Sequence, residues 1–258
     1  MSATAAPWIL LRGLTRESRH WGRFPQQLGA AFPGVSVICL DLPGNGKLNH
    51  MESPSSVEAM ADYCHAEAAR LGIAVPCRVL AMSLGAMVAV AWAQRHPRDI
   101  AAAVLISTSL RPFSPFYRRL RPANYPCLLR LLCLPASGRR IEAAILQATT
   151  RLVSDPATVI EHWLQWRREN PVSRRNVLNQ LLAAARYHAP RQRPLDRILL
   201  LAGARDQLVD SRCSLQLAAQ WAAPIAVHPA AGHDLPLDVE SWVFEQIRRW
   251  LESISATR

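Results

Sequence analysis

The chain has 258 residues, of which 50% are apolar and 19% are charged. This length accommodates one large domain or a core domain with an insertion, and the apolar content excludes intrinsic disorder for most of the chain. No apolar run approaches the roughly 18 residues that a membrane-spanning helix needs, and the first residues lack the basic region of a secretory signal. We therefore expect a cytoplasmic protein without a membrane span.

Positive charge is concentrated in one internal segment. The formal net charge is +11, from 30 basic and 19 acidic residues, and only Lys47 among the basic residues is not an arginine. Between residues 111 and 193 lie 15 basic and four acidic residues, so this segment accounts for the whole net charge. A localised positive field attracts anionic partners. Compositional drift would explain the choice of arginine over lysine, but it does not explain why acids avoid this segment.

The cysteines form no C-x-x-C pair and no cluster with the spacing of a zinc site. Cys39 and Cys77 fall in or beside apolar, strand-like runs, where free cysteine behaves as a small hydrophobic residue. We expect reduced structural thiols and no metal at all six positions, which are Cys39, Cys64, Cys77, Cys127, Cys133 and Cys213.

Short apolar runs alternate with helical patterns along most of the chain. The runs predict six buried strands, at 7–12, 35–41, 77–82, 102–108, 197–202 and 224–228. Helical spacing of apolar residues predicts helices at 57–71, 84–95 and 238–252. Such alternation indicates a parallel sheet with helices on both faces. We predict an α/β fold with about six parallel strands.

The strand rhythm breaks between about residues 110 and 195. Several prolines and three helix-like runs occupy this segment, at 139–153, 156–169 and 172–188. The pattern predicts a core made of residues 1–110 and 195–258, with an arginine-rich helical cap, residues 111–194, inserted into it.

Three polar residues follow predicted strands. Ser83 lies between a strand and a helix, with the small residues Ala81 and Gly85 two positions on either side. Asp206 follows the fifth predicted strand, and His233 follows the sixth. Reactive groups of a parallel sheet gather at the carboxyl ends of its strands, so we expect these side chains to meet. A serine hydroxyl becomes a nucleophile when a base removes its proton and a third group orients that base.

Five short motifs together resemble the α/β-hydrolase superfamily over almost the whole chain. They are Arg12-Gly13-Leu14 with Trp21, and residues 41–46, 81–85, 203–206 and 232–233. The resemblance implies that Ser83 is the nucleophile, His233 the general base and then acid, and Asp206 the carboxylate that orients the histidine. It also implies an oxyanion hole formed by the backbone N–H groups of Leu14 and Leu84.

The motifs depart from the superfamily at two positions. Arg12 stands where histidine is usual, which affects the shape of the oxyanion loop, and Ala81 replaces the first glycine of the serine motif. No glycine-rich phosphate loop is present, so no nucleotide is implied, and we expect no cofactor.

Each candidate site residue has a plainer alternative. Ser83 could serve only as a helix N-cap. His228 competes with His233 but lies within a predicted strand, and Asp210 competes with Asp206 but stands where the next helix begins. For Asp234 we expect a position on the surface or at the start of a helix.

The predicted cap suggests the substrate class. It is similar to the cap of small carboxylesterases that act on acyl chains held by an acidic carrier protein, such as the pimeloyl-carrier methyl ester esterases of biotin synthesis. Arginine suits such a carrier because it forms bidentate contacts with carboxylate and phosphate. We expect Trp21, Trp163 and Trp166 to contact substrate, although large aromatic residues more often belong to the core.

The sequence therefore predicts a serine hydrolase that cleaves a carboxylic ester or thioester through an acyl-enzyme, with an acyl-carrier-linked methyl ester as a candidate substrate. Two alternatives stay open, because one fold supports many reactions. They are a C–C bond hydrolase or lyase acting on an anionic metabolite, and a binding module without catalysis. Nucleic-acid binding is not expected, because the basic segment has no recognisable motif.

Overall fold

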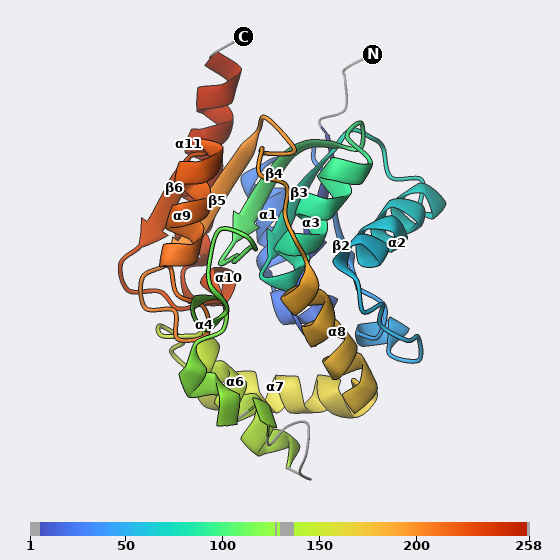
Figure 1. Cartoon of the computed structure of the whole chain (residues 1–258), viewed down its shortest axis with the longest axis vertical. Helices are drawn as coiled ribbons and strands as arrows, with labels where there is room; N and C mark the ends of the chain where they lie inside the picture. Colours follow the sequence, from blue (N-terminus) through green and yellow to red (C-terminus); the bar gives the residue numbers. More distant parts are fainter. Residues whose placement is uncertain (1–5, 127, 130–136, 257–258) are drawn as a thin grey trace.

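The computed structural model describes residues 6–126, 128–129 and 137–256. Its strands are β1 (Trp8–Leu11), β2 (Val37–Leu40), β3 (Cys77–Met82), β4 (Ile100–Ile106), β5 (Ile198–Gly203) and β6 (Ile225–His228). They form one sheet in the order β2-β1-β3-β4-β5-β6, and every neighbouring pair is parallel. The predicted α/β fold with six parallel strands is confirmed (Figure 1).

Helices cover both faces of the sheet. Successive residues of a strand point to opposite faces, and the apolar side chains on each face pack under helices. Ile9 and Leu11 pack in one buried cluster and Trp8 and Leu10 in the other. The first cluster lies under α2 (Val57–Arg70), α3 (Leu84–Arg95) and α9 (Arg212–Trp221), and the second under α1 (Phe24–Ala31) and α11 (Glu240–Ala256). No helix within the described residues has the length and apolar character to span a membrane.

Helix ends differ from the predicted ones where side chains capture the backbone. The helix predicted at 139–153 is α6 (Gly138–Thr149). It ends early because the backbone N–H groups of Arg151 and Leu152 donate to the carboxylate of Asp238. That carboxylate belongs to a short separate helix, α10 (Leu235–Asp238), which precedes α11.

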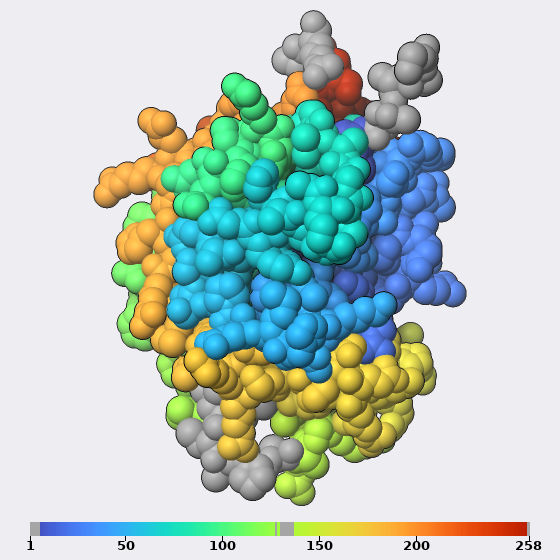
Figure 2. Space-filling view, turned by 90° about the vertical axis from the view of Figure 1, so that its right-hand side faces the viewer, coloured from blue at the N-terminus to red at the C-terminus, as the bar shows by residue number. Residues whose placement is uncertain are grey.

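Residues 111–194, here called the insertion, lie between β4 and β5. Where the structure describes this segment, its helices are α4 (Phe116–Arg119), α6, α7 (Pro156–Glu169), α8 (Arg174–Arg186) and a short 3₁₀ helix, Pro122–Asn124. Two more 3₁₀ helices, Ser18–Trp21 and Gly46–Leu48, lie outside the insertion. The insertion helices lie at the end of the sheet opposite both termini, beyond the carboxyl ends of the strands (Figure 1). In Figure 2 the yellow residues of the insertion form a band directly below the blue and cyan core.

The four cysteines within the described residues are free thiols, as predicted for them: Cys39, Cys64, Cys77 and Cys213. Burial raises the pKa of the Cys39, Cys64 and Cys77 thiols to about 12, so these thiols stay protonated at neutral pH. The predictions for Cys127 and Cys133 lie outside the described residues.

Candidate active site

Ser83 occupies a strained turn between β3 and α3. Its φ of 55° and ψ of −117° are unfavourable for a residue with a Cβ atom. Close packing holds the turn: a Cβ atom at Gly85 would lie 2.5 Å from the Arg12 carbonyl oxygen, and one at Gly13 would lie 3.0 Å from the Ser83 Cβ. Glycine at these two positions lets the end of β1 lie directly against the serine.

Helix capping does not account for Ser83. Although it precedes α3, its side chain makes no cap hydrogen bond. Ser56 and Ser173, by contrast, accept hydrogen bonds from the first turns of α2 and α8. The N-cap alternative for Ser83 is therefore wrong, and its hydroxyl is available to the cavity that the residue lines.

His233 and Asp206 form a buried pair. The Nδ1 atom of His233 lies 2.7 Å from the Oδ2 atom of Asp206, and each residue is 2% exposed. The other carboxylate oxygen accepts hydrogen bonds from the backbone N–H groups of Leu208 and Val209, which fixes its orientation. The Nε2 atom of His233 is buried and has no hydrogen-bond partner within the described residues. A carboxylate on Nδ1 favours the tautomer with its proton there, so Nε2 can accept a proton.

The competing residues are engaged elsewhere. The Asp210 carboxylate binds the guanidinium of Arg212, which lowers the pKa of Asp210 to about 2. The Nδ1 atom of His228 accepts hydrogen bonds from the backbone of Ala230 and Ala231. Neither Asp210 nor His228 lines the cavity within the described residues.

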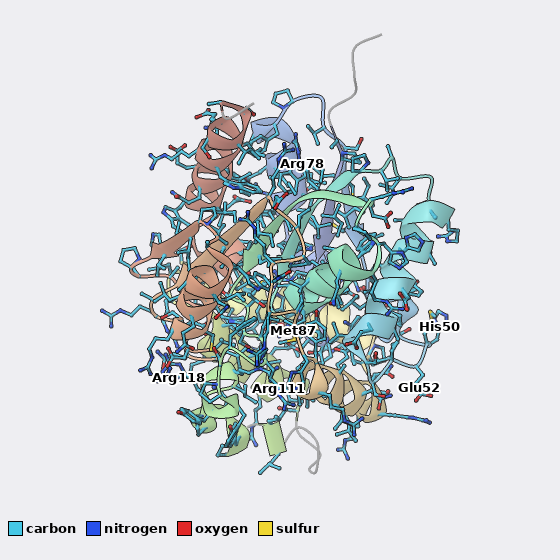
Figure 3. All side chains as sticks on the ribbon, turned by 45° about the horizontal axis from the view of Figure 1, so that its top comes forward. His50, Glu52, Arg78, Met87, Arg111 and Arg118 are labelled. Carbon is cyan, nitrogen blue, oxygen red and sulfur yellow. The ribbon has the colours of Figure 1, made fainter. Side chains whose placement is uncertain are left out.

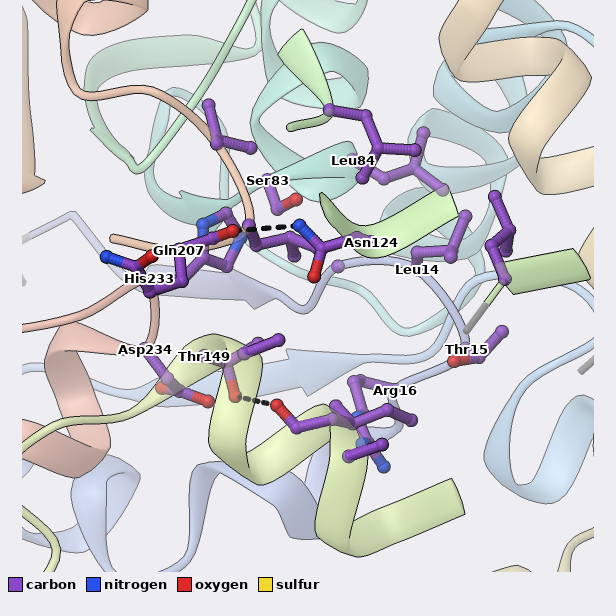
Figure 4. Close-up of a pocket in the computed structure, with 18 of the residues that line it drawn as sticks. Leu14, Thr15, Arg16, Ser83, Leu84, Asn124, Thr149, Gln207, His233 and Asp234 are labelled. Carbon is purple, nitrogen blue, oxygen red and sulfur yellow. Dashed lines mark hydrogen bonds between the residues drawn. The ribbon is translucent and has the colours of Figure 1, made fainter. Parts of the chain in front are cut away.

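A cavity of about 1000 Å³ lies beside Ser83 and His233. Ser83, His233, Leu14 and Leu84 all line it. Figure 4 shows Ser83, Leu84 and His233 near one another, with Asp234 and Arg16 farther from the serine. The first N–H groups of a helix have no partner within that helix, so the Leu84 N–H at the start of α3 is available to a negatively charged oxygen. The geometry is thus compatible with the predicted oxyanion residues.

The three tryptophans predicted to contact substrate are separated. Trp163 lines the cavity, whereas Trp21 and Trp166 are absent from the described lining. Trp21 stacks on Phe24, with ring centres 5.4 Å apart, and Trp166 packs against His20 at 5.0 Å. Since neither ring belongs to the described lining and both are held in packing contacts, the substrate role predicted for Trp21 and Trp166 lacks structural support.

Arg12 forms a buried ion pair that the sequence did not predict. Its guanidinium donates to both oxygens of Asp234, at 3.2 and 2.5 Å, and the two residues are 4% and 2% exposed. Arg12 directly precedes the Gly13-Leu14 segment, and Asp234 directly follows His233. The pair therefore joins the segment after β1 to the segment after β6. Asp234 is buried, so the surface part of its prediction is wrong, but it directly precedes α10, so the helix-start part is confirmed.

Side chains from the insertion hold the segment after β1. The buried carboxylate of Glu142 accepts hydrogen bonds from Arg16 and Arg167, each at 2.8 Å. The Oε1 atom of Gln180, on α8, accepts a 2.8 Å hydrogen bond from the backbone N–H of Thr15. These contacts connect the insertion to Thr15 and Arg16, which directly follow the Gly13-Leu14 segment.

One group outside the cavity has the composition of a metal site. The ligand atoms of His65, His96 and Asp99 all lie within 4.8 Å of one another. However, the two imidazole rings stack 3.7 Å apart and nearly parallel, and Asp99 is bound to His65 and Trp92. Parallel rings direct their nitrogen lone pairs along separate lines, so this arrangement suits hydrogen bonding better than metal coordination.

Comparison with known proteins identifies the family. The model of the alpha/beta hydrolase family matches residues 8–246, which is nearly the entire chain. The chain belongs to the alpha/beta hydrolase family. The parallel sheet and the strained serine turn agree with this assignment, and membership of the family indicates a hydrolase.

Individual alpha/beta hydrolases resemble the chain more weakly. A pimeloyl-[acyl-carrier protein] methyl ester esterase from Chromobacterium violaceum is 26% identical over 150 residues, which is 57% of this chain and about half (51%) of that relative's length. A putative lipase from Acinetobacter baumannii superposes with a TM-score of 0.78 at 20% identity, covering 99% of this chain and 87% of its own. An esterase from Thermogutta terrifontis gives 0.76 at 22% identity, with 98% and 91% covered. These structures share the fold.

Proposed function

We propose that the chain is a serine esterase in which Ser83, His233 and Asp206 form the catalytic triad. The observation that carries the proposal is the buried pair of His233 and Asp206 at 2.7 Å. The Nε2 atom of His233 has no partner in the described residues, and His233 and Ser83 line the same cavity. A carboxylate-oriented imidazole next to a strained serine turn is the arrangement that general-base activation of a hydroxyl requires.

The reaction follows from these positions. His233 Nε2 takes the proton of Ser83 as Oγ attacks the ester carbonyl carbon, and the backbone N–H groups of Leu14 and Leu84 stabilise the resulting oxyanion. His233 then donates that proton to the leaving alcohol as the C–O bond breaks, which leaves an acyl group on Ser83. A water molecule gives its proton to His233 and attacks this acyl group. The carboxylic acid leaves as the proton returns to Ser83.

Labelling with a fluorophosphonate tests the nucleophile. We expect one phosphonyl adduct per chain, located on Ser83 by peptide mass mapping, because Ser83 is the hydroxyl of the described cavity wall to which the proposal assigns an activating base. Ser109 is another serine of the cavity wall and provides the matched control. The Ser109→Ala protein should still carry the adduct on Ser83. An adduct on a different serine, or none, would argue against the proposed triad.

The proposed substrate is a methyl ester of an acyl chain attached to an acidic carrier protein, and the insertion is the proposed docking surface. Support comes from the name of the Chromobacterium violaceum relative, a pimeloyl-[acyl-carrier protein] methyl ester esterase, and from the 15 basic and four acidic residues between positions 111 and 193. Arg140, Arg168 and Arg175 of this segment are exposed.

Salt dependence tests the docking surface. Raising the salt concentration should lower kcat/KM for a carrier-linked methyl ester by about 10-fold or more, because electrostatic steering is screened. Hydrolysis of a short, neutral p-nitrophenyl ester should change little, since this substrate has no charge to steer. An equal response of both substrates would remove the docking proposal and leave the esterase proposal intact.

A further inference from the structure

The cavity wall has an excess of positive charge. Asp234 is the one carboxylate in the described lining. The same lining contains five arginines, which are Arg12, Arg16, Arg119, Arg140 and Arg151. Arg12 is neutralised by Asp234, and Arg16 is bound to Glu142. The guanidinium groups of the other three have no carboxylate partner within the described residues, and the remaining residues contain no aspartate or glutamate.

Among these three arginines, Arg119 is the least solvated. Arg140 and Arg151 are exposed, whereas Arg119 is half-buried. Burial and the neighbouring Arg111 lower the pKa of Arg119 to about 10, which still leaves it charged at neutral pH. Arg111 and Arg118, labelled in Figure 3, belong to the segment that follows β4, and Arg118 directly precedes Arg119 in α4.

A contact with the end of α8 satisfies only some of the hydrogen-bond donors of the Arg119 guanidinium. Its Nη2 atom donates to the carbonyl oxygen of Ala184 near the end of α8, a favourable position for a cation. A guanidinium has five N–H donors, and the buried Nε–H of Arg119 has no partner within the described residues. A half-buried guanidinium that has no carboxylate partner and one unused donor carries a desolvation cost, and an anion bound in the cavity would offset this cost.

We propose that Arg119 forms an anion subsite of the cavity, which binds a carboxylate or phosphate group of the substrate remote from the scissile ester. This proposal rests on the esterase function proposed above, because it assigns a role to the non-reacting end of the same substrate. Two sources offer this chemistry: a free carboxylate at the end of a dicarboxylic half-ester, and the phosphate of a carrier's prosthetic arm. In both cases the charge-assisted hydrogen bond to Arg119 selects the anionic substrate over a neutral one of equal length.

Matched substrates test the subsite. The monomethyl ester of a dicarboxylic acid is compared with its dimethyl ester and with a methyl-ester acyl thioester of phosphopantetheine, using wild type, Arg119→Gln and Arg119→Lys. We expect Arg119→Gln to raise KM for an anionic substrate by about 10- to 100-fold, with KM for the dimethyl ester unchanged. Arg119→Lys should restore part of this loss. A selective loss for the half-ester identifies the carboxylate as the ligand, and a selective loss for the thioester identifies the phosphate.

Binding without turnover separates this proposal from the esterase proposal. By calorimetry, wild type should bind adipate and phosphopantetheine, or one of the two, more tightly than it binds hexanoate. Arg119→Gln should lose this preference while its Tm shows that it is folded. Parallel changes for neutral and anionic ligands, or no change at all, would overturn the subsite. Failure to hydrolyse any ester, with the binding preference intact, would instead count against the esterase function alone.

Discussion

Ser83→Ala is expected to lower kcat for ester hydrolysis by about 10⁴- to 10⁶-fold, because the attacking hydroxyl is lost while the cavity stays intact. Alanine keeps a Cβ atom at the same strained φ of 55°, so the backbone strain and the fold should be unchanged. The measurement is steady-state hydrolysis of the p-nitrophenyl ester that wild type cleaves fastest, with Tm recorded for each protein.

Ser55→Ala is the control for this substitution. Ser55 is exposed and lies outside the cavity lining, so its loss should alter neither kcat nor Tm. If Ser83→Ala hydrolysed the ester as fast as Ser55→Ala, the nucleophile would have to be a different group, and the proposed acyl-enzyme would be wrong.

Arg12→Met is expected to lower the free energy of unfolding by about 3–5 kcal/mol, because it leaves the Asp234 carboxylate buried without a partner. For a chain of this size the loss corresponds to a decrease in Tm of roughly 10 °C. Methionine preserves much of the apolar contact with Trp21, whose ring centre lies 4.7 Å from the Arg12 guanidinium. Urea denaturation monitored by tryptophan fluorescence provides the measurement.

The double variant Arg12→Met/Asp234→Leu separates loss of the pair from loss of one partner. Removing both charges abolishes the desolvation cost, so the double variant should regain most of the stability that either single variant loses. Additive effects of about 1 kcal/mol or less for each substitution would indicate a solvated pair of little energetic value.

This ion pair explains how the site accommodates arginine where the superfamily usually has histidine. Arg12 and Asp234 are 222 positions apart in the sequence, yet Arg12 lies two residues before Leu14 and Asp234 directly follows His233, both of which belong to the proposed machinery. The substitution at position 12 therefore depends on an acid at position 234, and the two loops are held together by charge as well as by packing.

The sequence determined most of what depends on neighbouring residues. Apolar runs predicted all six strands, because a strand buried on both faces needs apolar side chains at nearly every position. Ala81 and Gly85, two positions on either side of Ser83, predicted the turn between β3 and α3, and at Gly85 the close approach of the Arg12 backbone leaves no room for a Cβ atom. Helix α1 was missed, because only Phe24 and Leu28 among its residues are buried and its local pattern is weak.

The tertiary structure decided which of these residues meet. Asp206 and Asp210 lie four positions apart after the same strand, but only Asp206 reaches His233, while Asp210 turns to Arg212. Likewise, Trp163 faces the cavity and Trp21 does not, although both are large and apolar. Such outcomes depend on how segments far apart in the chain pack around the sheet. A pattern of neighbouring residues indicates whether a position is buried, but it does not indicate which residue from a distant part of the chain will contact it.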